Sequence, residues 1–255
     1  MPRVMHRILI FATLLTLLVS CQQRRDATLV AAAISMRHAL LDLGEAYEEH
    51  HPRAAVRFHF ASSGVLVQQA AQGAPFDVLI LAGEEEMNRL AAAGHIEPAT
   101  RRVVATNRLI LAVPRGGRRP ARLEDLRETS FQRIALGSPG LVPAGRYAAQ
   151  ALRRSGLWDT LQPRLLFSLD AAQTVEYLQR DEVDAAFLYR SDAVEFPWLD
   201  VALELDPDLH APIRYEAVLV RDAPDPAGGR EFLKLLQDSL AEVVLRNHGF
   251  LPAAP

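Results

Sequence analysis

The sequence has one cysteine and one lysine, and both shortages exclude classes of protein. With Cys21 alone, no disulfide can form within the chain, so packing must supply the stability. Lys234 is the single lysine among 28 lysine and arginine residues, and the arginines are scattered rather than gathered in a run. The formal net charge is −3. We therefore expect no nucleic-acid partner, because proteins that bind nucleic acids carry a basic patch or stripe.

Catalytic and metal-binding motifs are missing as well. The eight histidines form no H-E-x-x-H pattern, and no G-x-S-x-G motif occurs, so metalloprotease and α/β-hydrolase signatures are absent. The run EEHH at 48–51 resembles a metal cluster only superficially, since it lies at the end of an expected helix. We therefore predict a protein that is not an enzyme, has no catalytic residue and needs no cofactor.

A long apolar run lies near the N-terminus, after two arginines. Its twelve uncharged residues, 8–19, are too few for a membrane-spanning helix, which takes about 20, but they match the core of a signal peptide. The run ends in LVSC, which resembles the lipobox of bacterial lipoproteins. We predict a signal peptide over 1–20, lipidation of Cys21 and a linker over 21–27. The alternative is a plain secretory peptide with an incidental cysteine, and in either case the mature protein works outside the cytoplasm.

From Thr28 onward, strand and helix patterns alternate, which predicts an α/β fold with parallel sheets covered by helices. We expect two lobes, lobe I over 28–107 plus 213–255 and lobe II over 108–212, each a sheet flanked by helices. A small ligand would bind in the cleft between the lobes. The expected strands are 28–33, 55–61, 77–82, 108–114, 133–137, 164–167, 184–189 and 213–221, and the expected helices include 35–51, one capped by Ser63, 84–94, 145–155, 171–180 and a single long one over 228–250.

Four of the expected helix starts have a chemistry suited to an anion. Each follows a strand or loop, so its unpaired N–H groups point toward the carboxyl edge of a sheet, where ligands bind in open α/β folds. Each start carries about half a positive charge, and several together can hold a dianion without arginine or lysine. Taken singly, however, serines at these positions are more often helix caps than ligands. The starts are Ser35, Ser62-Ser63-Gly64, PGLVPAG at 139–145 and Asp170-Ala171-Ala172.

Three segments resemble one known family in their order and spacing. They are FASSGVLVQQAAQGAPFDVLILA, GSPGLVPAGRYAAQALRRSGLWDTLQPRL and DEVDAAFLYRSDA. From about residue 29 to about 250, the sequence is similar to the periplasmic molybdate-binding proteins of ABC transporters. The resemblance implies the type II periplasmic-binding-protein fold, and molybdenum bound only as molybdate by neutral donors. Those donors would be the hydroxyl and amide of Ser35 and of Ser63, the amides of Ala144 and Ala171, and the phenol of Tyr189.

This donor set also constrains the ligand on chemical grounds. A fully deprotonated tetraoxo dianion offers only acceptors, which amides, hydroxyls and a phenol can satisfy. Hydrogen phosphate carries a proton and needs an acceptor, so the set favours molybdate, tungstate or sulfate over phosphate. Among these three, the resemblance selects molybdate or tungstate. It also implies an ABC permease in the inner membrane as the partner, and we expect a monomer.

Some positions depart from the family pattern, and other functions stay open. Ile34 stands where a small residue is common, Gly64 where another serine is common, and Ala171 where a larger aliphatic residue is common. We interpret Arg146, beside the third helix start, as part of a solvated face. The alternatives are a binder of another anion, such as sulfate or a carboxylate clamped by Arg146, a secreted enzyme, or an anion sensor without a role in transport.

Overall fold

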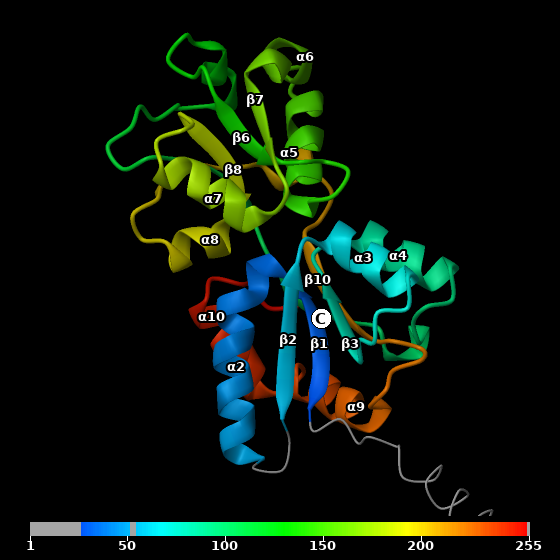
Figure 1. The fold of residues 1–255 in the computed structure, drawn as a ribbon. Coiled ribbons are helices and arrows are strands. Elements are labelled where there is room, and N and C mark those ends of the chain that lie inside the picture. Colours follow the sequence, from blue (N-terminus) through cyan, green and yellow to red (C-terminus); the bar gives the residue numbers. More distant parts are fainter. Residues whose placement is uncertain (1–26, 52–54, 254–255) are drawn as a thin grey trace, which may run out of the picture.

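The structure is a computed structural model that describes residues 27–51 and 55–253. The predicted signal peptide and Cys21 lie outside the described residues. Within them, no helix is both long enough and apolar enough to cross a membrane. The chain forms two sheets, each flanked by helices, stacked one above the other (Figure 1).

Lobe I is built on a sheet with the strand order β2-β1-β3-β10-β4. Strand β1, which lies between β2 and β3, is buried on both faces, because Val30 and Ala32 pack with α2 while Ala31 packs with α3 and α4. Figure 1 shows α2 on one side of this sheet and α3 with α4 on the other. The strands are β1 Thr28–Ala33, β2 Val56–Ala61, β3 Val78–Leu81, β4 Arg102–Thr106 and β10 Arg214–Leu219, and the helices are η1 Ile34–Met36, α2 Arg37–His50, α3 Ser63–Ala71, α4 Glu84–Ala92, η2 Pro98–Thr100, α9 Pro226–Leu235 and α10 Ser239–Asn247.

Lobe II repeats this plan with the strand order β7-β6-β8-β5-β9. Three strands, β5, β6 and β8, are fully buried, and α5 and α7 both contact β6. The strands are β5 Leu109–Val113, β6 Ile134–Gly137, β7 Leu165–Ser168, β8 Ala185–Tyr189 and β9 Asp200–Glu204, and the helices are η3 Leu123–Arg127, α5 Pro143–Arg154, α6 Trp158–Leu161, η4 Gln162–Arg164, α7 Ala171–Gln179, α8 Arg190–Glu195 and η5 Pro207–Leu209.

Both sheets are mixed, so the prediction of parallel sheets is wrong at β5 and β10. β10 is antiparallel to β3 and β4, and β5 is antiparallel to β8 and β9. These two strands are the first after the chain crosses between the lobes, at 107–108 and at 205–213. A parallel strand needs a crossover connection, usually a helix, that returns the chain to the sheet edge where the preceding strand began. No helix of the same lobe directly precedes β5 or β10 to make this connection.

The long C-terminal helix predicted over 228–250 is in fact two helices, α9 and α10. Gln237 and Asp238 donate to carbonyl groups three residues back, at 2.9 and 3.0 Å, and this tighter turn ends α9. Asp238 is then extended (φ −83°, ψ 159°) as the N-cap residue of α10. The break lets α9 contact β10 and β1 while α10 contacts α2, so one apolar pattern serves two packing surfaces.

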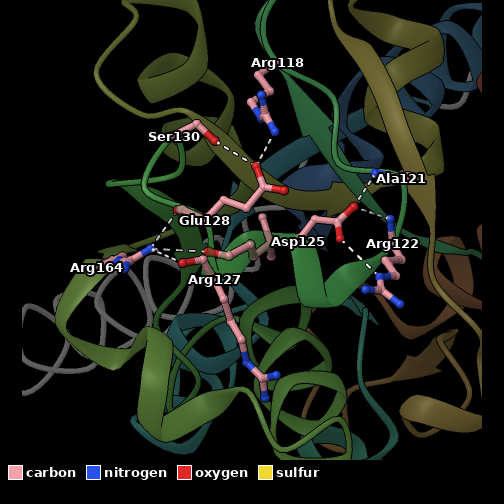
Figure 2. Close-up of polar contacts among 9 residues, drawn as sticks. Arg118, Ala121, Arg122, Asp125, Arg127, Glu128, Ser130 and Arg164 are labelled. Atoms are coloured by element: carbon pink, nitrogen blue, oxygen red, sulfur yellow. Dashed lines mark hydrogen bonds and ion pairs between the residues drawn. The ribbon is translucent and has the colours of Figure 1, made fainter.

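The arginine-rich crossing before β6 is held by ion pairs and carbonyl contacts, as Figure 2 shows. Asp125 accepts hydrogen bonds from the Ala121 and Arg122 amides at 2.9 and 3.1 Å, which fixes the start of η3. Arg118 pairs with Glu128. Arg164 Nη1 donates to four backbone carbonyl oxygens, which lie in η3 and just after it, at distances of 3.0 to 3.4 Å. These arginines stabilise a surface connection far from the cleft.

The two lobes share a continuous core. A single cluster of buried apolar residues includes Ala33 and Tyr215 from lobe I together with Leu136 and Tyr189 from lobe II. The rings of Tyr189 and Tyr215 meet edge to face, with their centroids 6.0 Å apart. Apolar contacts of this kind hold the lobes closed on each other.

Candidate functional site

The structure brings all five predicted site residues together around one cavity between the lobes. Its volume is about 10 Å³. A space of this size holds about one water molecule, so a tetraoxo anion requires the two walls to move apart. None of the described residues that line this cavity has a charged side chain. They are Ala33, Ile34, Ser35, Ser62, Ser63 and Ala82 from lobe I, and Val142, Pro143, Ala144, Ala171 and Tyr189 from lobe II.

At the start of α3, neither serine caps the helix, so the expectation that Ser63 is the cap is wrong. Ser62 is the N-cap residue, and its side chain makes no capping hydrogen bond. Ser63 is the first helical residue, and its Oγ accepts a hydrogen bond of 3.0 Å from the Ala82 amide. Because that bond uses a lone pair of the oxygen, the Ser63 hydroxyl proton remains free to donate to a ligand.

Ser35 lies in the short turn η1 rather than at the start of α2. Its Oγ is 3.0 Å from the hydroxyl oxygen of Tyr215, and either group could be the donor. Tyr215 is fully buried in β10, and burial raises the pKa of its phenol far above the ordinary value. Tyr215 therefore holds the Ser35 hydroxyl in place at the wall of the cavity.

Two helix starts of lobe II supply backbone donors. Ala144 is the second residue of α5, behind Pro143, and Ala171 is the first residue of α7. The first amides of a helix have no intrahelical partner, and no described residue outside these helices gives the Ala144 and Ala171 amides a backbone acceptor. Asp170 caps α7 by accepting a hydrogen bond of 2.8 Å from the Gln173 amide, so the cap leaves the Ala171 amide free.

Glycine allows α5 to approach β6 closely enough to place Ala144 at the cavity. A Cβ atom at Gly145 would lie 1.7 Å from the carbonyl oxygen of Gly137, inside any tolerable contact. The VPAG segment therefore combines a proline that suits the first turn of a helix with a glycine that fits against the strand.

Tyr189 is the last residue of β8 and lines the cavity. The side chain is buried, and among the described residues its hydroxyl has no hydrogen-bond partner. Burial raises the pKa of Tyr189 well above the usual value, so the phenol keeps its proton and can donate. The Asp192 carboxylate accepts a hydrogen bond of 2.8 Å from the Tyr189 amide, which ties the end of β8 to α8. Burial raises the pKa of Asp192 to about 7.

Arg146 does not lie on a solvated face, contrary to the sequence interpretation. It reaches across the cleft and donates two hydrogen bonds, of 2.7 and 2.6 Å, to the carboxylate of Glu86 on α4. The Glu86 side chain is fully buried and that of Arg146 is 16% exposed. Burial lowers the pKa of Arg146, but the hydrogen bonds and charge of Glu86 outweigh it and the net shift is upward. The arginine is thus neutralised by a lobe I partner and does not line the cavity.

The backbone of the two lobes also meets directly beside the cavity. The Gly64 amide on α3 donates a hydrogen bond of 3.0 Å to the carbonyl oxygen of Leu141 in the loop before α5. A Cβ atom at Gly64 would lie 2.6 Å from that oxygen. The departure from the family pattern at Gly64 therefore coincides with the tightest approach between α3 and lobe II.

A second interlobe network lies at a neighbouring cavity of about 270 Å³, to which Ser35 and Ala171 also contribute. Glu195 of lobe II contacts His38 and His248 of lobe I, each at 3.0 Å, and His248 contacts Asp42 at 2.9 Å. Burial lowers the pKa of His248, but its two carboxylate partners raise it more, so the net shift is upward. The lobes are thus joined by polar contacts on both sides of the predicted site.

No group of three or more histidine, cysteine or acidic residues among the described positions is arranged to hold a metal ion. The Glu48 carboxylate instead accepts a hydrogen bond of 2.9 Å from the Val56 amide, at the start of β2. Within the EEHH run, Glu48 therefore links α2 to the start of β2.

Comparison with known proteins places this geometry in a family. Residues 28–251 match the family model described as bacterial extracellular solute-binding protein. The chain belongs to this family. A putative ABC transporter substrate-binding lipoprotein of Bacillus subtilis, YvgL, is 31% identical over 233 residues, which cover 91% of this chain and 89% of that protein. The molybdate-binding protein ModA of Haemophilus influenzae is 31% identical over 225 residues, which cover 87% and 88%.

Solved structures confirm the predicted two-lobed type II fold of this solute-binding protein. The periplasmic molybdate-binding protein of Azotobacter vinelandii has a TM-score of 0.82 at 21% identity, with 89% of this chain and all of that chain covered (100%). The sulfate-binding protein SubI of Mycobacterium tuberculosis has a TM-score of 0.75 at 17% identity, with 90% and 87% covered. At such identities the likeness shows the fold alone, so the ligand must be argued from the residues of the cavity.

Sequence reasoning missed three residues that shape this region. Tyr215 was read only as part of a strand, although it holds Ser35. Glu86 lies in the helix expected over 84–94, and nothing in a helix pattern shows that it faces Arg146 60 positions away. Ser62 was named only as part of the helix start Ser62-Ser63-Gly64, and only the folded structure shows that its hydroxyl has no partner among the described residues.

Proposed function

We propose that this solute-binding protein captures molybdate or tungstate and delivers it to an ABC permease. The observation that carries the proposal is the convergence of uncharged donors from both lobes on one cavity without a charged side chain. Two relatives support it through their names, one as a molybdate-binding protein and one as an ABC transporter substrate-binding lipoprotein.

The donors suit a fully deprotonated tetraoxo anion. The hydroxyls of Ser35, Ser63 and Tyr189 and the amides at the starts of α5 and α7 can all donate, while none of the described lining residues has a carboxylate that could accept a hydrogen bond from hydrogen phosphate. A carboxylate ligand would call for an arginine clamp, and Arg146 is bound to Glu86 instead. We assign no chemical reaction to this site, in keeping with relatives that are solute-binding proteins.

Binding would follow the opening and closing of the two lobes. The chain crosses between them at 107–108 and at 205–213, and these segments form the hinge of the proposed motion. In the open form the two walls of the cavity separate and admit the anion. Closure then surrounds the anion with donors from both lobes and excludes water, and the closed form would be the one that the permease recognises.

Thermal unfolding in the presence of single anions tests this proposal. A ligand that binds only the folded protein stabilises it by RT ln(1 + [L]/Kd), about 2.7 kcal/mol at a hundred times Kd. We expect molybdate and tungstate to raise the unfolding midpoint clearly, and phosphate at the same concentration to leave it unchanged. A midpoint that responds to none of these anions would count against an oxyanion carrier.

For the location of the protein, we propose a lipid anchor at Cys21, which rests on the LVSC sequence and on the lipoprotein name of the Bacillus relative. Cys21→Ser is expected to move the protein from the membrane fraction to the soluble fraction of the producing bacterium, with its anion affinity unchanged. Fractionation followed by immunodetection measures this. A variant that still sediments with membranes contradicts the anchor.

A further inference from the structure

The hydroxyl of Ser62 is a buried polar group without a protein partner. The residue is 5% exposed, and its Oγ has no hydrogen-bond partner among the described residues. In folded proteins most buried side-chain polar atoms are hydrogen-bonded, so an exception requires an explanation. Only one other side-chain atom of the described chain shares this condition, the hydroxyl of Tyr189.

The usual role of a serine at this position does not explain the hydroxyl. Ser62 is the N-cap residue of α3 with the extended backbone that suits a cap (φ −64°, ψ 147°), and an N-cap serine ordinarily accepts a hydrogen bond from an amide in the first turn. The Ser62 side chain makes no such bond. The backbone therefore permits capping, and the side chain points elsewhere.

The two residues with unpartnered hydroxyls line the same cavity but come from opposite lobes. Ser62 lines it from lobe I and Tyr189 from lobe II. Their neighbour Ser63, in contrast, already accepts a hydrogen bond from the Ala82 amide. Two free hydroxyls across a space with no charged side chain match a ligand that offers several acceptor oxygens.

We propose that the Ser62 hydroxyl donates a hydrogen bond to the bound oxyanion, as a further ligand-binding residue beside Ser63. The inference rests on the proposed function, because it assumes that the cavity holds a tetraoxo anion. The adjacent serines then act differently. The Ser63 hydroxyl is oriented by Ala82, whereas the Ser62 hydroxyl completes its hydrogen bonding only when the anion is present.

Calorimetric titration of Ser62→Ala with molybdate tests the inference. We expect the dissociation constant to rise about tenfold or more, as for the loss of a hydrogen bond to a charged group. The unfolding midpoint of the unliganded variant is expected to stay the same or rise, since the substitution removes an unsatisfied buried oxygen. A purely structural role would instead lower the midpoint. Ser62→Gly is a second variant, since glycine is well tolerated at N-cap positions. We expect it to weaken molybdate binding in the same way.

Thr28→Val is the matched control. Thr28 is a buried hydroxyl residue of lobe I at the far end of β1, and its Oγ1 donates a hydrogen bond of 2.8 Å to Asp225. The control should lower the unfolding midpoint and leave the affinity unchanged. If the dissociation constant of Ser62→Ala for molybdate lies within twofold of that of the parent protein, the hydroxyl hydrogen-bonds only to water and the inference is overturned. If the parent protein itself binds no oxyanion, the proposed function fails with it.

Discussion

Arg146→Met is expected to hold the lobes apart and to weaken anion binding severely. The substitution removes both hydrogen bonds that the fully buried Glu86 carboxylate accepts from Arg146 in the closed form, and leaves it only the longer contact of 3.3 Å with Arg89. Breaking a buried ion pair on one side costs about 3–5 kcal/mol. The open form avoids this cost because the carboxylate regains water, so the loss falls on closure rather than on the folding of either lobe. Small-angle scattering should show a larger radius of gyration, and calorimetry a weaker molybdate affinity.

The double variant Glu86→Met, Arg146→Met is the control for this prediction. Replacing a buried pair by apolar residues of similar volume is often neutral or stabilising. The double variant is therefore expected to recover most of the affinity that the single variant loses. Unchanged affinity and unchanged dimensions in Arg146→Met would mean that the pair does not contribute to closure.

Gly64→Ala is expected to obstruct closure by steric contact rather than by charge. The added Cβ atom would lie 2.6 Å from the Leu141 carbonyl oxygen of the other lobe, and because this neighbour is backbone rather than a flexible side chain, we expect the lobes to move apart. Overpacking of this kind costs about 1–3 kcal/mol. Within lobe I, alanine favours the helix over glycine by about 1 kcal/mol, so the stability of that lobe should stay the same or rise.

The two effects of Gly64→Ala can be measured separately. We expect the unfolding midpoint without ligand to be unchanged or higher, and the molybdate affinity to fall by about 5- to 150-fold, which corresponds to the same free energy. Ala70→Gly, on the same helix but away from Leu141, serves as a helix control that should lower the midpoint without changing affinity. A Gly64→Ala protein that binds as tightly as its parent would show that the interlobe contact at Leu141 is dispensable.

The sequence predicted the parts of the site that depend on local rules. A helix start exposes its first amides wherever it occurs, so the segments PGLVPAG and Asp170-Ala171-Ala172 could be named from local rules. The family resemblance then selected Ala144 and Ala171 within them, as it selected Ser63 and Tyr189, and the structure places all four at the same cavity. These residues sit at the ends of strands and helices, where the alternation of elements fixes their position along a sheet edge.

What the sequence did not predict depends on contacts between distant segments. Arg146 has an ordinary place in a first helical turn, and only the contact between the lobes shows that it forms an ion pair with Glu86. The direction of β5 and β10 depends on how the chain crosses between lobes, which no strand pattern records. The end of α9 was also missed, because the apolar spacing continues through Leu236 into α10, although Asp238 followed by Ser239 is a cap signal.

Charge placement separates the site from the contacts that close it. The donors around the cavity are neutral, while the charged pair of Arg146 and Glu86 and the network around Glu195 lie on its flanks. A dianion in the cavity therefore meets hydroxyls and amides, and the ion pairs join the lobes around it. An anion held there as proposed would therefore contact uncharged donors, although an arginine lies nearby.

Titration calorimetry of the protein with molybdate and with sulfate tests the central claim most directly. We expect one molybdate to bind per chain, and the affinity for sulfate to be lower by a wide margin. We also expect a large excess of sulfate to leave the molybdate titration nearly unchanged. Sulfate that binds as tightly as molybdate, or molybdate that gives no binding heat in any buffer, would contradict the assignment.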